Sequence, residues 1–204
     1  MPESFLFTRL LDVHHHLDAA GIDHAVGGAI ALGFHVREPR TTNDIDLNVS
    51  VPAAEGSRLF AALPAELVIP ADARSRLARE GWVRLRYADP EIPLDLFTPQ
   101  HPTFHALITA RAEPFDGLDG LKILTATDVV ILKALFNRSK DWPDIESLLE
   151  AGTADLDEAV AWLGEILGPG SPEEQRLRAL AAKTGPQGEG DRPARIDWNR
   201  IARQ

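Results

Sequence analysis

The chain has 204 residues, of which 44% are hydrophobic and 25% charged, so it can bury the core of one domain or of two small ones. It contains no cysteine, which excludes disulfides, cysteine-ligated zinc, iron–sulfur clusters and a cysteine nucleophile. Its formal net charge of −10 is unlike that of general nucleic-acid binders, which are more often basic.

The first half of the chain alternates short helical and extended patterns. Apolar residues at helical spacing indicate helices, and alternating apolar and polar residues indicate strands. In chain order we expect a helix over residues 4–20, a strand from 24 that ends at Gly27–Gly28, a helix over 29–36, a strand over 43–51, a helix over 52–63, a short strand within 65–70, a helix over 71–80 that ends at Gly81, and strands over 82–88 and 92–99, the last one limited by Pro93 and Pro99.

The pattern changes after about residue 103. Residues 103–117 indicate part helix and part loop, and residues 121–125 a short strand or extended segment. Beyond them only helices are expected, over 126–139, 143–151, 155–167 and 171–183. We therefore predict an α+β fold: a small mixed β-sheet core flanked by helices over residues 1–122, a helical C-terminal region over 123–184, and a loosely ordered tail over 185–204.

The N-terminus and the hydropathy of the chain bear on its location. The N-terminal stretch "MPESFLFTRLLDVHHH" lacks the basic lead of a signal peptide. No apolar run approaches the roughly 18 residues of a membrane span. We expect a cytoplasmic protein without a membrane partner.

Two acids stand one residue apart in "TTNDIDLNV". Asp44 and Asp46 project from one face of the expected strand, about 6–7 Å apart along it. Asp95 in "PLDLF" lies on a later apolar strand. If the two strands are neighbours, three carboxylates converge, and they repel one another unless a cation lies between them. Two Mg²⁺ (or Mn²⁺) ions would make this a two-metal site for phosphoryl or nucleotidyl transfer, because oxygen-rich sites favour these ions over Zn²⁺.

A glycine turn precedes this strand. In "VGGAIALG" a strand ends at Gly27–Gly28 and a helix begins at once. Glycines let the backbone approach a ligand closely, and the first amides of a helix point toward an anion. This arrangement indicates a phosphate-binding turn, although a purely structural turn would have the same pattern.

The stretch "GGAIALGFHVREPRTTNDIDLNV" resembles the nucleotidyltransferase superfamily that includes DNA polymerase β. Within it, the sequence is most similar to small bacterial members related to the AbiEii toxin of abortive-infection and toxin–antitoxin systems. A second stretch, "LKALFNRSKDWPDIESLL", resembles the family's segment after the core, and the matching segments span residues 24 to 150. The positions that match are Gly27, Gly28, Arg40, Asp44, Asp46, the third acid Asp95, and then Lys133, Arg138, Lys140, Asp141 and Asp144. Many members carry Gly-Ser where this chain carries Gly27–Gly28.

The resemblance implies a metal-dependent transfer of a nucleoside monophosphate from an NTP to an acceptor hydroxyl. It implies that the three acids ligate the metal ions, and that glycine-turn amides, together with Lys133 and Arg40, bind the nucleotide. Arg37 flanks the same region, and Lys140, Asp141 and Asp144 are accessory candidates. Together with Arg138 they could instead form a structural polar cluster that ties the two halves of the chain together. The implied acceptors are RNA such as tRNA, protein or a small molecule, and a cognate antitoxin is an implied partner.

Alternatives remain at the level of sequence. The chain could keep the fold as a catalytically weak nucleotide-binding or partner-binding protein, or hydrolyse phosphate esters with water as nucleophile. Asp95 could instead pair with an arginine on an edge strand. The arginines between Arg74 and Arg86 could contact RNA or simply lie on solvated faces. His14, His15 and His16 are consecutive on a helix and point in different directions, so they do not predict a metal site.

Overall fold

The structure is a computed structural model that describes residues 2–115, 118 and 120–184. These residues form two compact units. The first consists of residues 2–30 and 41–123 of the described chain, and the second of residues 31–40 and 124–184. The predicted tail over residues 185–204 lies outside the described residues.

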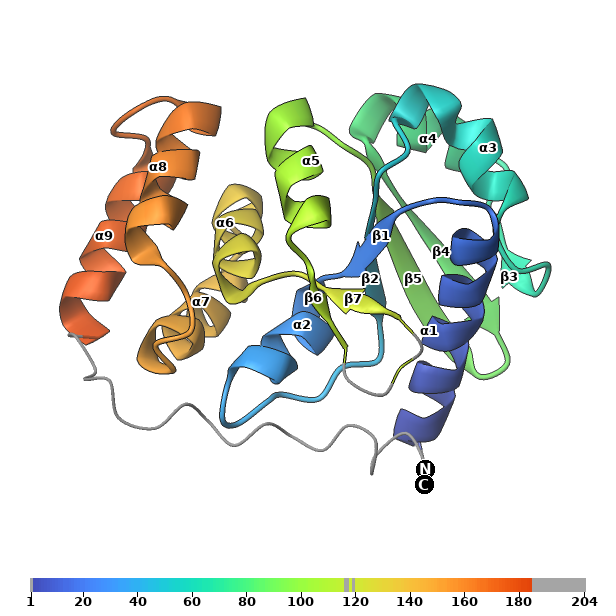
Figure 1. Cartoon of the computed structure of the whole chain (residues 1–204), viewed down its shortest axis with the longest axis horizontal. Helices are drawn as coiled ribbons and strands as arrows, with labels where there is room; N and C mark the ends of the chain where they lie inside the picture. The colour runs from blue at the N-terminus through green and yellow to red at the C-terminus, as the bar shows by residue number, and fades with distance from the viewer. Residues whose placement is uncertain (1, 116–117, 119, 185–204) are drawn as a thin grey trace. The chain divides into compact units, whose positions relative to one another are not determined.

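The first unit contains a mixed β-sheet (Figure 1). Its elements are α1 (Pro2–Ala19), β1 (His24–Val26), the start of α2 (Gly28–His35), β2 (Ile45–Val49), a 3₁₀ turn η1 (Ala53–Glu55), α3 (Gly56–Ala61), β3 (Leu67–Val68), α4 (Ala73–Glu80), β4 (Trp82–Ala88), β5 (Glu91–Phe97), α5 (Pro102–Ala110), β6 (Glu113–Pro114) and β7 (Lys122–Ile123). The seven strands lie in the order β3-β4-β5-β2-β1-β7-β6. The β2–β5 and β1–β7 pairs are parallel and the others antiparallel, which confirms the predicted α+β fold with a mixed sheet.

One face of this sheet is apolar because its strands alternate with period two. Leu85, Leu94 and Leu47 lie on this face of β4, β5 and β2, and all three are buried. Helix α1 packs here (Figure 1), with its Asp12 hydrogen-bonded to the hydroxyl of Tyr87. Burying this face leaves the other face of the same strands for polar side chains.

The second unit is helical, as predicted for this part of the chain. It contains the end of α2 together with α6 (Ala126–Phe136), α7 (Asp141–Glu150), α8 (Leu156–Leu167) and α9 (Pro172–Thr184). Helix α6 packs against α7, α8 and α9. Side chains cap three of these helices, since Thr125, Asp155 and Ser171 each accept a hydrogen bond from a backbone N–H three residues later.

Several element boundaries differ from the prediction, and three segments are informative. Pro93 lies inside β5 instead of limiting it, and its missing N–H costs no ladder bond to β2, because the β2–β5 pairing begins at Leu94. Helix α7 begins at Asp141, so Pro143 lies in its first turn, where an N–H has no helical partner. Residues 103–117, for which the sequence indicates part helix and part loop, contain most of α5 and then β6.

Candidate active site

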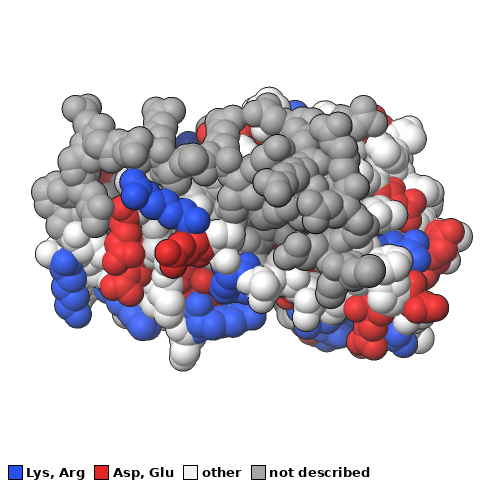
Figure 2. Space-filling view, turned by 90° about the horizontal axis from the view of Figure 1, so that it is seen from below, with Lys and Arg blue, Asp and Glu red and all other residues white. Residues whose placement is uncertain are grey.

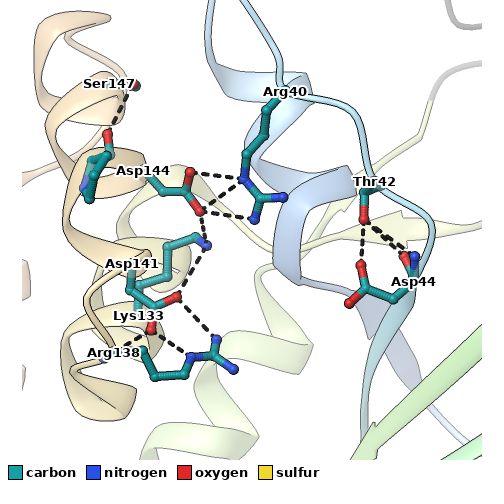
Figure 3. A network of polar contacts seen from close by, with 9 residues as sticks. Arg40, Thr42, Asp44, Lys133, Arg138, Asp141, Asp144 and Ser147 are labelled. Atoms are coloured by element: carbon teal, nitrogen blue, oxygen red, sulfur yellow. Dashed lines mark hydrogen bonds and ion pairs between the residues drawn. The ribbon is translucent and has the colours of Figure 1, made fainter.

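Two of the three predicted acids, Asp46 and Asp95, lie on neighbouring strands, whereas Asp44, expected on the same strand as Asp46, lies just before it. β2 and β5 are parallel neighbours in which Asp46 lies opposite Asp95. Asp44 immediately precedes β2, and its side chain accepts a hydrogen bond from the Thr42 hydroxyl (Figure 3). The expectation that the two strands are adjacent is therefore confirmed, and β5 is an interior strand between β4 and β2.

The alternative that Asp95 pairs with an arginine is confirmed, although β5 is not an edge strand. The sequence did not indicate which arginine the partner is. Arg84 on β4 lies directly opposite Asp95 in the antiparallel β4–β5 pair. Its Nε donates to Asp95 Oδ1 at 2.7 Å and its Nη2 to Asp95 Oδ2 at 2.6 Å, a two-bond arrangement that only arginine makes. The Arg84 Nη2 also lies 3.8 Å from Asp44 Oδ2. Hydrogen bonding to Asp95 raises the pKa of Arg84 above its already high usual value.

A signal for this pair was present in the sequence. Strands 82–88 and 91–97 are separated by the two residues Asp89 and Pro90, and a two-residue connection sets Ala88 opposite Glu91. Counting back along both strands from that pair places Arg84 opposite Asp95.

The other arginines of this region have separate contacts. Arg76 and Arg79 form ion pairs with Glu80, and the Arg74 guanidinium lies 5.5 Å from the centre of the Phe60 ring. Figure 2, which views the molecule from below and so from the side away from α4, shows the same kind of surface, with blue Lys and Arg side chains beside red Asp and Glu side chains. These contacts favour the interpretation of the arginine run as ordinary surface over that of an RNA contact.

The glycine turn lies against Asp46. Gly28 has a φ of +56°, and a Cβ placed on it would overlap the Asp46 carboxylate. The backbone N–H of Gly27 donates to the carbonyl oxygen of Asp46 at 2.8 Å. The Gly27 amide is therefore occupied, and the amides that remain for an anion are those at the start of α2, from Gly28 onward.

The second motif forms an ion-pair network within the second unit (Figure 3). The buried Lys133 ammonium on α6 lies 2.6 Å from Asp144 Oδ2 and 3.8 Å from Asp141 Oδ1, both on α7. Arg40 donates from Nε and Nη2 to Asp144, and Arg138 donates to both oxygens of Asp141. Of the predicted polar cluster, Arg138, Asp141 and Asp144 lie in this network and Lys140 does not. The network joins the segment after α2 to helices α6 and α7.

Asp144 is charged in this network. Burial opposes its ionised form, but the hydrogen bonds from Arg40 and Lys133 outweigh that effect and hold the pKa of Asp144 below its usual value. Lys140 is exposed and takes no part in an ion pair with the described residues, and Arg37 is exposed in the segment after α2. Nucleotide contacts by Lys133, Arg40 or Arg37 stay a prediction.

The donor chemistry of the three acids fits a divalent metal ion. Asp44, Asp46 and Asp95 offer only carboxylate oxygens from neighbouring positions, which suits Mg²⁺ or Mn²⁺. Three carboxylates face one guanidinium there, so negative charge remains for a cation to neutralise. Within residues 2–115, 118 and 120–184, however, no three His, Asp or Glu side chains already lie close enough together to enclose an ion.

Comparison with known proteins gives structural similarity only. No family model matches the sequence, and no curated protein matches it significantly. The solution structure of ANT(2'')-Ia, an antibiotic-resistance factor, shares 15% identity over 86% of this chain and 89% of that one, with a TM-score of 0.46. JHP933 from Helicobacter pylori shares 14% identity over 88% of this chain and 87% of that one, with a TM-score of 0.42. A crystal structure of ANT(2'')-Ia in complex with adenylyl-2''-tobramycin shares 13% identity over 90% of this chain and 97% of that one, with a TM-score of 0.41.

Similarity of this extent assigns no activity, so a function must be inferred from the residues themselves. The helices offer no membrane anchor as a clue, since none of them in the described part of the chain has the length and apolar character needed to cross a bilayer.

Proposed function

We propose that the chain is a metal-dependent nucleotidyltransferase that moves a nucleoside monophosphate from an NTP to an acceptor hydroxyl and releases pyrophosphate. The observation that carries this proposal is the placement of Asp44, Asp46 and Asp95 around neighbouring strands, with the glycine turn directly against Asp46. In this arrangement, carboxylates that can bind a divalent ion lie beside backbone amides that can bind a phosphate. An NTP-binding site needs both kinds of group.

Each residue has a role in the proposed reaction. The acceptor oxygen forms a bond to the α-phosphorus, the bond from that phosphorus to the bridging oxygen breaks, and the hydroxyl proton passes to water. Bound Mg²⁺ or Mn²⁺ would supply neutralisation of phosphate charge. Asp44 and Asp46 would hold the ions, Asp95 would hold the catalytic ion and orient the hydroxyl, and the amides from Gly28 onward would donate to phosphate oxygens.

The proposal includes a biological setting. The resemblance to AbiEii-related proteins supports a place in a toxin–antitoxin or abortive-infection system, with a cognate antitoxin as partner. We place the protein and its NTP-consuming reaction in the cytoplasm. The acceptor is RNA, protein or a small molecule.

The test is transfer of label from each α-labelled NTP in Mg²⁺ or Mn²⁺, with RNA, a protein extract and small polyols such as tobramycin as acceptors. We expect Asp46→Asn to abolish label transfer. The matched control is Glu91→Gln, which removes an exposed acid at the start of β5 and should keep wild-type transfer. Metal-dependent consumption of NTP that persists in Asp46→Asn would sink the proposal.

The same experiment separates the alternatives. Label on RNA, protein or polyol names the acceptor. Release of free nucleoside monophosphate without an acceptor product indicates a phosphohydrolase, and NTP binding without turnover indicates a catalytically weak binding protein.

A further inference from the structure

The Arg84 guanidinium lies against the carboxylates that a metal ion would need as ligands. Its guanidinium binds both oxygens of Asp95 and lies 3.8 Å from Asp44, so a single cation already reaches carboxylates from β5 and from the start of β2. The Asp95 side chain is 8% exposed, whereas that of Arg84 is 51% exposed. The acid is fixed in the sheet, and the arginine is the partner with room to move.

The two kinds of cation compete for the same oxygens. A divalent ion ligated by Asp44 and Asp95 would bring two positive charges to within a few ångströms of the guanidinium, and like charges at that distance repel. Without any cation, three carboxylates would face one another, and the buried one would lack a partner. The site therefore needs either the guanidinium or a metal ion at any one time.

We propose that Arg84 is the counter-cation of the metal-free site, which binds Asp95 and Asp44 until a divalent ion displaces it. This inference rests on the proposed function, because the displacing ion is the one that the transferase reaction requires. Arg84 is thus a positioning residue: it keeps the acids in place before metal loading and lowers the metal affinity of the site.

The chain offers a matched control on the same strand. Arg86 lies two residues from Arg84 on the same exposed face of β4, opposite Pro93 instead of an acid. Arg86 forms no ion pair with the described residues. Removing either arginine takes one positive charge from this face, but only Arg84 is bound to the acids. If the lost positive charge alone raised the cation affinity, the affinity would rise equally in the Arg84 and Arg86 variants. If the metal ion has to displace Arg84 from the acids, the affinity would rise only in the Arg84 variant.

The experiment measures Mn²⁺ binding by calorimetry and by the loss of the free-ion signal in electron paramagnetic resonance. We expect Arg84→Gln to bind Mn²⁺ about five- to tenfold more tightly than Arg86→Gln, since a charge-assisted pair that is half exposed is lost. Arg84→Lys keeps the charge without the second hydrogen bond and should fall between Arg84→Gln and wild type.

Thermal unfolding gives a readout that does not depend on activity. In chelator, Arg84→Gln should melt below wild type, because Asp95 has lost its partner. Saturating Mn²⁺ should then raise the melting temperature of Arg84→Gln more than that of wild type or Arg86→Gln.

Three results would count against the inference. Equal Mn²⁺ affinity in Arg84→Gln and Arg86→Gln, or weaker binding in Arg84→Gln, overturns it while leaving the proposed transferase intact. Absence of Mn²⁺ binding in wild type and in both variants overturns the metal-dependent function and the inference together.

Discussion

The carboxylate of Asp46 occupies the space in which a side chain on Gly28 would begin. Gly28 also has a φ of +56°, in the left-handed region that favours glycine. The two observations are independent, and both require glycine here. Serine, which many nucleotidyltransferases carry at the matching position, does not fit this turn while Asp46 keeps its conformation.

Replacing Gly28 should therefore cost more than the backbone conformation alone. The control is Gly21→Ala, because Gly21 has a similar φ of +62° and no atom from beyond its own neighbours in the chain lies within 4 Å of the point that its Cβ would occupy. We expect Gly21→Ala to lose about 1–2 kcal/mol of unfolding free energy in urea. Gly28→Ala should lose about 1–3 kcal/mol more, because Asp46 must also move. Equal losses would show that Asp46 is free to shift.

Asp144 holds two cations in the second unit. Asp144→Ala leaves the buried Lys133 ammonium without its nearest carboxylate, so we expect a loss of about 3–5 kcal/mol of unfolding free energy. The control is Glu55→Gln, which breaks an ion pair with Arg58 that is exposed on both sides and should cost less than about 0.5 kcal/mol. A loss in Asp144→Ala as small as that of the control would mean that water replaces the carboxylate.

The buried imidazole of His24 gives the first unit a pH dependence. His24 accepts or donates a hydrogen bond with His14 at 2.8 Å, and burial lowers the pKa of His24, although its hydrogen bond to the Ile22 carbonyl opposes that shift. A lowered pKa means that the folded state prefers neutral His24. The associated stability is complete above the usual value of about 6.5 and is lost as the pH falls from there through the lowered pKa.

The measurement is the urea midpoint at pH 7.5 and pH 5.5. We expect a lower midpoint at pH 5.5 in wild type and a weaker pH dependence in His24→Asn. His15→Gln removes an exposed histidine from the same helix that carries His14 and should keep the wild-type dependence. A midpoint that does not change between the two pH values would contradict the prediction.

The chain has one tyrosine, which makes its ionisation directly visible. Tyr87 is fully buried, and its hydroxyl donates to Asp12 Oδ2 at 2.9 Å. Burial, reinforced by this bond, raises the pKa of Tyr87 above its usual value of about 10. The stability from neutral Tyr87 is present below pH 10 and is lost as the pH rises further. Phenolate absorbance at 295 nm should therefore appear only together with the loss of helical circular dichroism, and an earlier, separate rise would refute this.

The acids of the site could be predicted because strands carry a strict period of two. Asp44 and Asp46 interrupt an apolar alternation, and the same is true of Asp95, so each stands out within its own strand. The adjacency of the two strands was inferred from a family resemblance, and the register confirms it. Helices with clear caps and glycine ends, such as α4 before Gly81, were also predictable.

The features that were missed depend on pairing between segments. Arg84 looked like one arginine in a run, and only the β4–β5 register gives it Asp95 as a partner. The Gly27 amide looked available for phosphate, but it donates to the carbonyl oxygen of Asp46 on β2. Pro93 looked like a strand end, because a single strand does not reveal which of its edges is paired. The local period of a strand shows on which face of the sheet a side chain lies. Only the pairing between strands shows which residue lies next to it.

The two-residue connection between β4 and β5 has a consequence for how this chain can vary. One residue inserted at Asp89–Pro90 would shift the register of the hairpin and move Arg84 away from Asp95, although no residue of the site had changed. Loops usually tolerate insertions, but the length of this connection determines which residue of β4 lies opposite Asp95. In related chains the length of this turn should covary with the presence of the arginine–aspartate pair, and a chain that lost one would have no reason to keep the other.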